Sequence, residues 1–203
     1  MITLYHAPQS RSSRMIWLLE ELHAPYAIFP VSIFRPMTGA GAPDPANPHP
    51  DKQVPAIAHN GVVVTESLAI VLYLADAFPE AGLAPAIGHP HRGPYLACAA
   101  WYAAALEPAM FAHFAGELDS RPDKRRNYDA VVRRLEEALA AGPYMLGERF
   151  SAVDILVGSA INWARQAFPE SAALDAYAAR CRARPAALKA AGLDDSQGVQ
   201  RAA

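Results

Sequence analysis

The segment 52–69, KQVPAIAHNGVVVTESLA, constrains the fold of this chain more than any other part of the sequence. Short apolar runs flank Asn60-Gly61, the pair favoured in a type I′ hairpin turn because both central residues need a positive φ. We therefore predict two short antiparallel strands. Pro55 has no backbone N–H and fits poorly inside a sheet, so Val54-Pro55 should lie at the strand entrance. A bend there leaves the backbone of Val54 free to pair with a ligand.

The residues after the second strand are typical of a helix start. Thr65-Glu66-Ser67 precedes apolar residues at helical spacing: Leu68, Val71, Leu72 and Ala75. The first N–H groups of a helix have no partner within it and attract a carboxylate. Val54 can pair with the backbone of a peptide-like ligand, Ser67 with its carboxylate and Glu66 with its ammonium. The segment therefore predicts a site for a peptide with a free α-amino acid end.

The order of QVPAI, a hairpin, and ES followed by AIVLYL resembles the glutathione site of the cytosolic glutathione transferases. The resemblance implies that the bond before Pro55 is cis and that Glu66 and Ser67 hold the γ-glutamyl group. It also implies that glutathione is the co-substrate.

The same resemblance extends to the residues just before the bend. Lys52 and Gln53 precede Val54 where members of the family place groups that hold the glycyl carboxylate or the backbone of glutathione. We therefore expect Lys52, Gln53 and Val54 to bind glutathione. Arg35, at the entrance of the preceding loop, is a further candidate for this ligand.

A glutathione transferase must hold the cysteine of glutathione as thiolate, because the thiolate is the nucleophile. A free thiol has a pKa near ~8.5, and lowering it by roughly two units requires about 2.7 kcal/mol of preferential interaction with the anion. One good hydrogen bond and a helix N-terminus can supply this free energy. The donor should lie where the first strand meets the first helix, in the segment YHAPQSRSSR.

Three serines lie in that segment, and the spacing S-x-x-S-R from Ser10 onward resembles the serine-using, theta-like branch of the family. By this resemblance Ser10 is the expected donor to the sulfur. Two alternatives stay open, Ser12 and Tyr5, since other branches use an early tyrosine. Ser10 could also be an ordinary helix N-cap. The cysteine-using branches are excluded because no cysteine precedes Cys98.

The order of the expected elements divides the chain into two domains. Residues 1–78 read as strand, helix, parallel strand, proline-rich loop, hairpin and helix, an α/β thioredoxin-like order. Prolines and glycines mark 79–91 as a linker. Residues 92–203 show helical periodicity and predict an all-α helical bundle, bent or ended early at Pro108. The tail beyond Pro185 is small and polar, and we expect it to be frayed.

Composition excludes several classes of function. The chain has 203 residues and a net charge of −2, without the basic excess that binds nucleic acid or an anionic membrane. Its apolar runs are shorter than the roughly 20 residues of a membrane span, and its first residues are unlike a leader peptide. The seven histidines are scattered, and Cys98 and Cys181 lie in alanine-rich helical contexts. We expect a cytoplasmic protein with no metal and no disulfide.

The helical half carries two further signals. Ser151 and Asp154 have the spacing of a capping box at a helix start, and the family has a similar box in its helical domain. The basic cluster at 124–134 reads as a solvated helix face with internal ion pairs. Aromatic side chains that could line an apolar electrophile pocket are Tyr102, Phe111, His113 and Trp163.

The resemblance implies a homodimeric detoxification enzyme that conjugates the glutathione thiolate to small hydrophobic electrophiles. Two alternatives stay open. One is a glutathione-dependent isomerase, lyase or peroxidase, because a fold does not fix the reaction. The other is a non-catalytic module that binds glutathione for partner recognition.

Overall fold

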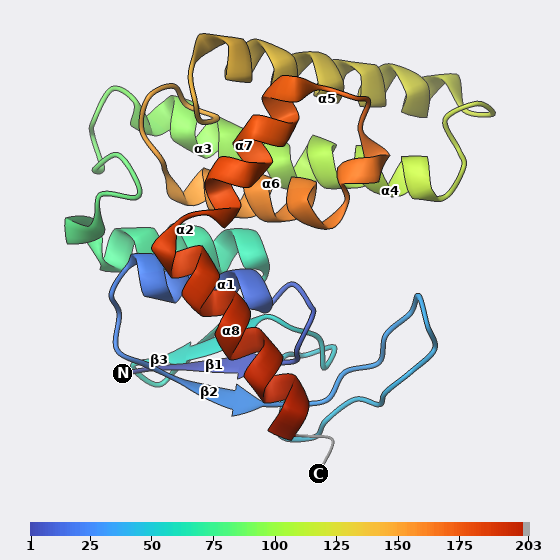
Figure 1. Cartoon of the computed structure of the whole chain (residues 1–203). Helices are drawn as coiled ribbons and strands as arrows, with labels where there is room; N and C mark the ends of the chain where they lie inside the picture. Colours follow the sequence, from blue (N-terminus) through green and yellow to red (C-terminus); the bar gives the residue numbers. More distant parts are fainter. Residues whose placement is uncertain (201–203) are drawn as a thin grey trace. The chain divides into compact units, whose positions relative to one another are not determined.

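The structure is a computed structural model that describes residues 1–200 of the chain and the side chains of residues 1–195. Two compact units are present. Unit 1 combines residues 1–81 with the segment from Pro185 onward, and unit 2 comprises residues 82–184 (Figure 1). Each unit is described in turn.

Unit 1 contains a four-stranded mixed sheet. Its strands are β1 (Ile2–His6), β2 (Tyr26–Pro30), β3 (Ala56–His59) and β4 (Val62–Thr65), in the order β2-β1-β3-β4. β1 and β2 are parallel, and the two other pairs are antiparallel. Because side chains alternate across a strand, Ile2, Leu4 and His6 point to one face and are fully buried. The predicted thioredoxin-like order is confirmed.

The predicted hairpin and its entrance are also confirmed. Asn60 and Gly61 have φ values of 51° and 78°, the positive values that a type I′ turn requires. The Val54-Pro55 bond is cis. Both residues lie before β3, so the backbone of Val54 is outside the β1–β3 and β3–β4 ladders.

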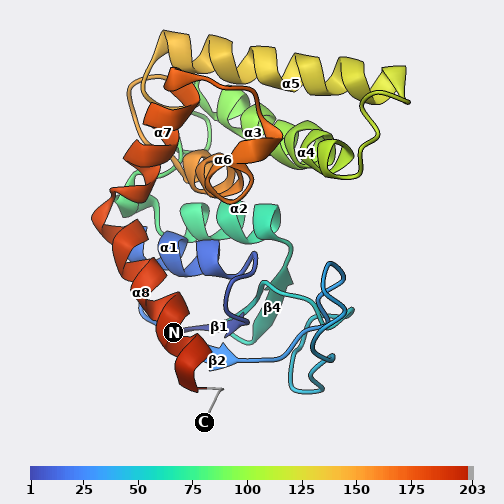
Figure 2. The same ribbon diagram turned by 45° about the vertical axis from the view of Figure 1, so that its right-hand side comes forward.

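The helices of unit 1 are α1 (Ser13–Glu21), α2 (Ser67–Ala77), the short 3-10 helix η1 (Pro79–Ala81) and α8 (Pro185–Gln200). α1 buries a continuous apolar stretch from Met15 to Leu19, which explains its place against the sheet. α8 lies alongside α1 (Figures 1 and 2). An ion pair between Lys189 Nζ and Glu20 Oε2, 2.7 Å apart, joins these two helices.

The expectation of a frayed tail after Pro185 is wrong, and the helical unit does not extend to the end of the chain. Instead, α8 belongs to unit 1. Proline is tolerated in the first turn of a helix, and the alanine-rich residues that follow favour helix. Ala190 and Asp194 are buried, so α8 has an inner face even though its composition looks polar.

Unit 2 is helical. Its elements are α3 (Arg92–Trp101), the π-helical segment η2 (Tyr102–Leu106), α4 (Glu107–Phe114), α5 (Pro122–Ala141), α6 (Ala152–Trp163), the 3-10 helix η3 (Arg165–Ala167) and α7 (Ala172–Arg182). α6 is the core helix, with nine buried residues. Pro108 lies in the first turn of α4, immediately after the π-helical segment, and the helical backbone continues past it to Phe114.

The predicted capping box opens α6. Asp154 Oδ2 accepts hydrogen bonds from the backbone N–H and the hydroxyl of Ser151, at 2.9 and 3.0 Å. Its other oxygen accepts from the Met145 N–H and the Tyr177 hydroxyl, at 2.9 and 3.0 Å. Burial raises the pKa of Asp154, against the lowering effect of these hydrogen bonds. All four bonds serve the packing of unit 2, so the role of Asp154 is structural.

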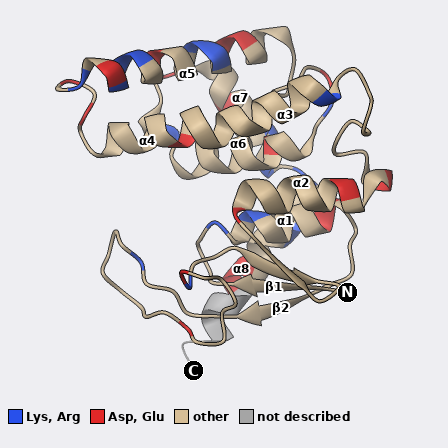
Figure 3. Cartoon of the chain, turned by 180° about the vertical axis from the view of Figure 1, so that it is seen from behind, with Lys and Arg blue, Asp and Glu red and all other residues tan. Residues whose placement is uncertain are grey.

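The basic cluster lies on α5, where cationic and anionic side chains alternate along the helix (Figure 3). Arg125 and Asp129 form one i,i+4 ion pair at 3.9 Å, and Arg133 and Glu137 form another at 3.8 Å. These side chains are at least 45% exposed, which confirms the interpretation of a solvated face. Across the described residues, every helix is too short or too polar to cross a membrane.

Candidate active site

The predicted site residues lie close together in the fold, at one end of the strands of the sheet in unit 1. β3 runs antiparallel to both of its neighbours, with Ala56 opposite Tyr5 in β1 and Thr65 in β4. The end of β1, the start of β3 and the end of β4 therefore lie at the same end of the sheet. Three segments adjoin the strands at this end: the turn that contains Ser10, the Val54-Pro55 bend and the Glu66-Ser67 pair. α1 and α2 also begin there, so the positive ends of two helix dipoles are available to an anion.

The loop before the bend is fastened by two buried side chains. Asn47 donates a hydrogen bond from Nδ2 to the Gln53 carbonyl at 2.8 Å and accepts one at Oδ1 from the His49 N–H at 3.0 Å. His49 Nδ1 in turn accepts from the Asp51 N–H at 3.1 Å. This network holds the backbone immediately before Val54.

Glu66 and Ser67 stand at the N-terminus of α2 with different surroundings. Glu66 has a positive φ of 68°, and its side chain is 78% exposed. Its Oε1 lies 4.0 Å from His49 Nε2, which links the helix start to the loop. The Ser67 hydroxyl is buried and has no hydrogen-bond partner among the described residues. Buried polar groups in native structures are nearly always paired, so this hydroxyl is a candidate hydrogen-bonding group for a ligand.

Lys52, Gln53 and Arg35 already make contacts within unit 1. Lys52 has a φ of 53°, and its Nζ donates to the Asn47 carbonyl at 2.8 Å. An ammonium has three donors, so two are left for a ligand. Gln53 is exposed and contributes its carbonyl to Asn47. The Arg35 guanidinium donates to the Pro8 and Gln9 carbonyls, at 2.6 and 3.1 Å, and so braces the turn before α1.

The serines of that turn form a compact hydrogen-bonded group. Ser10 Oγ lies 2.7 Å from Ser12 Oγ and donates to the Ala7 carbonyl at 2.7 Å. Ser12 is fully buried, whereas Ser10 is half-buried and therefore more accessible to a ligand. Tyr5 points to the sheet face opposite to His6, with its ring 5.3 Å from that of Phe29.

The group of serines continues inward to two residues that the sequence analysis did not single out, His6 and Asp194. His6 Nδ1 lies 2.8 Å from Ser12 Oγ, and His6 Nε2 lies 3.1 Å from Asp194 Oδ1. The second contact is at ion-pair distance without the alignment of a regular hydrogen bond. Asp194 also accepts from the Ser13 hydroxyl at 2.8 Å and from the Gln9 N–H at 3.1 Å. Burial raises the pKa of Asp194, but the close contact with His6 and the hydrogen bonds from Ser13 and Gln9 outweigh it and lower the pKa below its ordinary value.

These missed residues differ in the signal that the sequence offered. Asn47 and His49 stand in a proline-rich loop next to the predicted site, and their position there was a usable signal. His6 looked like an isolated histidine at a strand end. Asp194 is 185 residues from Gln9, which it contacts, so only the folded chain brings the two together.

Unit 2 has exposed aromatic side chains and a hollow along α5. Phe111 and Trp163 are 39% and 54% exposed, with ring centroids 6.2 Å apart, and Phe114 packs on the same tryptophan. Tyr102 is buried, and its hydroxyl donates to Glu107. His113 stacks on the Tyr128 ring, with centroids 5.9 Å apart. Of the four predicted pocket residues, therefore, Phe111 and Trp163 are the exposed ones.

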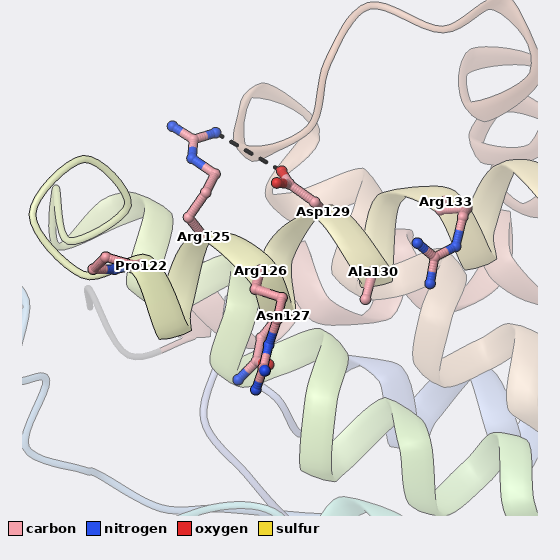
Figure 4. A pocket seen from close by; sticks show the side chains of 7 residues that line it. All are labelled: Pro122, Arg125, Arg126, Asn127, Asp129, Ala130 and Arg133. Carbon is pink, nitrogen blue, oxygen red and sulfur yellow. Dashed lines mark ion pairs between the residues drawn. The ribbon is translucent and has the colours of Figure 1, made fainter.

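The hollow is lined by residues of α5, most of which are charged or polar (Figure 4). Arg125 is paired with Asp129 there, and Arg126 and Asn127 extend on another side of the helix. The predicted glutathione-binding residues all belong to unit 1, whereas the residues that line this hollow belong to unit 2. Among the described residues, no cluster of three or more His, Cys, Asp or Glu side chains is placed to hold a metal ion.

Comparison with known proteins covers both units. The family model described as "Glutathione S-transferase, N-terminal domain" matches residues 1–76, and the model described as "Glutathione S-transferase, C-terminal domain" matches residues 99–185. Glutathione S-transferase 3 of Schizosaccharomyces pombe is 35% identical over 78 residues, which are 38% of this chain and 31% of that protein. The chain spans less than two thirds of the length of the curated relatives it matches.

Solved structures agree over nearly the whole chain. A glutathione transferase from Methylococcus capsulatus str. Bath is 28% identical with a TM-score of 0.76, and the match covers 98% of this chain and 100% of that one. A sphingomonad glutathione S-transferase complexed with glutathione is 26% identical with a TM-score of 0.77, covering 95% and 98% of the two chains. With both domain models matched in order, the chain belongs to the glutathione S-transferase family.

Proposed function

We propose that this protein is a glutathione transferase of the serine type, in which Ser10 donates a hydrogen bond to the glutathione thiolate. The observation that carries the proposal is the buried, unpartnered hydroxyl of Ser67 at the N-terminus of α2. It lies at the same end of the sheet as the cis Val54-Pro55 bend and the Ser10 turn. A carboxylate bound there satisfies the hydroxyl and the first N–H groups of the helix together.

Each predicted contact has a physical basis in unit 1. Ser67 binds the γ-glutamyl carboxylate, and the exposed carboxylate of Glu66 pairs with the ammonium of the same group. The backbone of Val54, which lies outside the sheet ladders, pairs with the backbone of glutathione. Lys52 and Gln53 lie on the neighbouring loop, where they hold the glycyl end.

The thiolate is stabilised by a change of partner at Ser10. Its hydroxyl, which donates to the Ala7 carbonyl in this structure, turns to donate to sulfur when glutathione is bound. The N-terminus of α1 adds a favourable dipole. Together they supply the roughly 2.7 kcal/mol that lowers the thiol pKa by two units. The thiolate then attacks a small hydrophobic electrophile.

Substitution of the candidate donors tests the assignment. In Ser10→Ala, we expect turnover with a generic aromatic electrophile at about pH 6.5 to fall by roughly tenfold to a hundredfold, because each unit of thiol pKa is tenfold in thiolate. Ser120→Ala, an exposed serine of unit 2, is the matched control. Full turnover in Ser10→Ala together with its loss in Tyr5→Phe would show that the donor is misassigned.

A substrate panel separates the transferase from other glutathione-dependent enzymes. An isomerase, lyase or peroxidase of the same fold would use glutathione without accumulating a conjugate. A non-catalytic module would be retained on immobilised glutathione without forming any thiolate, and its Glu66→Ala variant would not be retained.

As part of the proposal, we expect a cytoplasmic homodimer. Its dimer contact would cover the exposed valines of the edge strand β4, Val62 and Val63. Light scattering of the purified protein tests whether it is a dimer.

A further inference from the structure

A chain of hydrogen-bonding groups runs from Ser10 into the interior of unit 1. Its links are Ser10 Oγ to Ser12 Oγ at 2.7 Å, Ser12 Oγ to His6 Nδ1 at 2.8 Å, and His6 Nε2 to Asp194 Oδ1 at 3.1 Å. His6 and Ser12 are fully buried, and the Asp194 side chain is 12% exposed. The proposed function uses only the outermost of these groups.

Formation of a thiolate releases a proton that must be accepted somewhere. A serine hydroxyl can accept one proton and donate another, so Ser10 and Ser12 can pass a proton on without a net change. A histidine can hold that proton, and a carboxylate on its far side stabilises the resulting imidazolium, as in the Ser-His-Asp arrangement of hydrolases. The order of groups in this chain is the one that such a transfer requires.

Resting on the proposed function, we propose that His6, paired with Asp194, accepts the proton of the glutathione thiol through Ser12 and Ser10. The S–H proton moves to Ser10 Oγ, the Ser10 proton moves to Ser12 Oγ, and the Ser12 proton moves to His6 Nδ1. Afterwards His6 donates to Ser12, Ser12 donates to Ser10, and Ser10 donates to the thiolate. The proton stays in the protein as an imidazolium beside the Asp194 carboxylate, so charge and atoms balance.

Contacts around these hydrogen-bonding groups set the direction of proton transfer. A carboxylate only accepts hydrogen bonds, so Asp194 favours the imidazole tautomer with hydrogen on Nε2 and leaves Nδ1 as the acceptor. Asp194 is itself held by the Ser13 hydroxyl and the Gln9 N–H. The neighbouring elements face His6 with Ser12, the N-cap residue of α1, and with Asp194 of α8. The Arg35 guanidinium lies on the carbonyls of Pro8 and Gln9.

Proton release on glutathione binding tests the inference directly. Calorimetry at about pH 7 in buffers of different ionisation enthalpy measures the protons released per site, and ultraviolet difference absorbance measures the thiolate. For the wild type we expect thiolate formation with a net release near zero. In His6→Asn, the asparagine amide keeps a partner for Ser12 but cannot hold a proton. We expect that the thiolate in this variant forms with release of about one proton, or that the pKa of the glutathione thiol rises by about one unit. Asp194→Asn should change the proton release and the thiol pKa in the same direction as His6→Asn.

Two matched variants control for surface and charge effects. Asp195→Asn removes a neighbouring carboxylate that is exposed, and His23→Asn changes an exposed histidine whose φ of 50° asparagine tolerates. Both should behave as the wild type. Circular dichroism checks that each variant is folded. If buried His6→Asn fails this check, Asp194→Asn and the imidazole ¹⁵N shifts of His6 in the wild type give the answer.

The outcomes separate this inference from the proposed function. If the wild type forms no thiolate with glutathione, both fail. If it forms the thiolate but releases about one proton to the buffer, the relay alone is overturned. The relay is also overturned if the wild type retains the proton and both His6→Asn and Asp194→Asn retain it equally. Protonation of the His6 ring on addition of glutathione supports it.

Discussion

Ser67 is the residue whose environment most directly indicates a ligand. Its hydroxyl is buried without a partner in the part of the chain that the structure describes, a state that native proteins rarely keep without a functional reason. The sequence predicts Ser67 as a ligand-binding residue because an acid-serine pair at a helix start is a local pattern. The burial of its hydroxyl depends on tertiary packing, which no local pattern reports.

The variant Ser67→Ala should therefore separate binding from stability. Removing an unpaired buried hydroxyl leaves the free energy of unfolding unchanged or raises it, whereas removing a paired one typically lowers it by about 1 kcal/mol. Glutathione binding should weaken by roughly tenfold, which corresponds to about 1.4 kcal/mol. Thermal unfolding and calorimetric titration give the two values. A clear loss of stability with unchanged affinity would show that the hydroxyl has a structural partner instead.

Asp194 gives a second prediction at this scale, one of pH dependence. Its pKa is lowered in the folded protein, so its ionised form contributes stability above the unfolded pKa of about 3.9. That contribution is lost as the pH falls through the lower, folded pKa. We expect Asp194→Asn to lower the free energy of unfolding by roughly 1–3 kcal/mol near pH 7, and the difference from the wild type to disappear in strong acid. Denaturant titrations across this range check it, and a difference that persists in acid would contradict the account.

At the scale of elements, α6 and α7 approach each other closely at Gly158. A Cβ atom at this position would lie 2.8 Å from Cys181 Sγ and 3.1 Å from its Cβ. Gly158→Ala should therefore destabilise unit 2 by about 1–3 kcal/mol, the usual cost of overpacking. Gly93→Ala on α3 is the control, because nothing lies within 4 Å of a Cβ there and alanine favours helix. Equal stability of the two variants would refute the close approach.

Elements with a local cause were predictable from the sequence. The β3–β4 hairpin follows from Asn60-Gly61, the bend from Val54-Pro55, and the start of α6 from Ser151 and Asp154. α8 was missed because its helix has a buried face only where it packs on α1. The link from His6 to Asp194 was out of reach for the same reason.

At the scale of the whole molecule, neither cysteine of the chain is suited to act as the reactive sulfur. Cys98 and Cys181 are free and buried in unit 2, and burial raises their pKa values to about 11 and about 12. Both are therefore protonated at neutral pH and shielded from reagents. We expect a thiol-specific reagent to leave the native protein unlabelled and to label both cysteines after denaturation. Rapid labelling of the native protein would identify a competing nucleophile in the chain.

Both family domains are present in order, and the groups expected to hold glutathione all lie in unit 1. The central claim is that these groups bind glutathione and ionise its thiol beside Ser10. The most direct measurement is the pH dependence of thiolate absorbance in the complex. The account predicts a thiol pKa roughly two units below the free value near ~8.5, and a return toward that value in Ser10→Ala. A thiol pKa in the wild-type complex equal to that of free glutathione would contradict it.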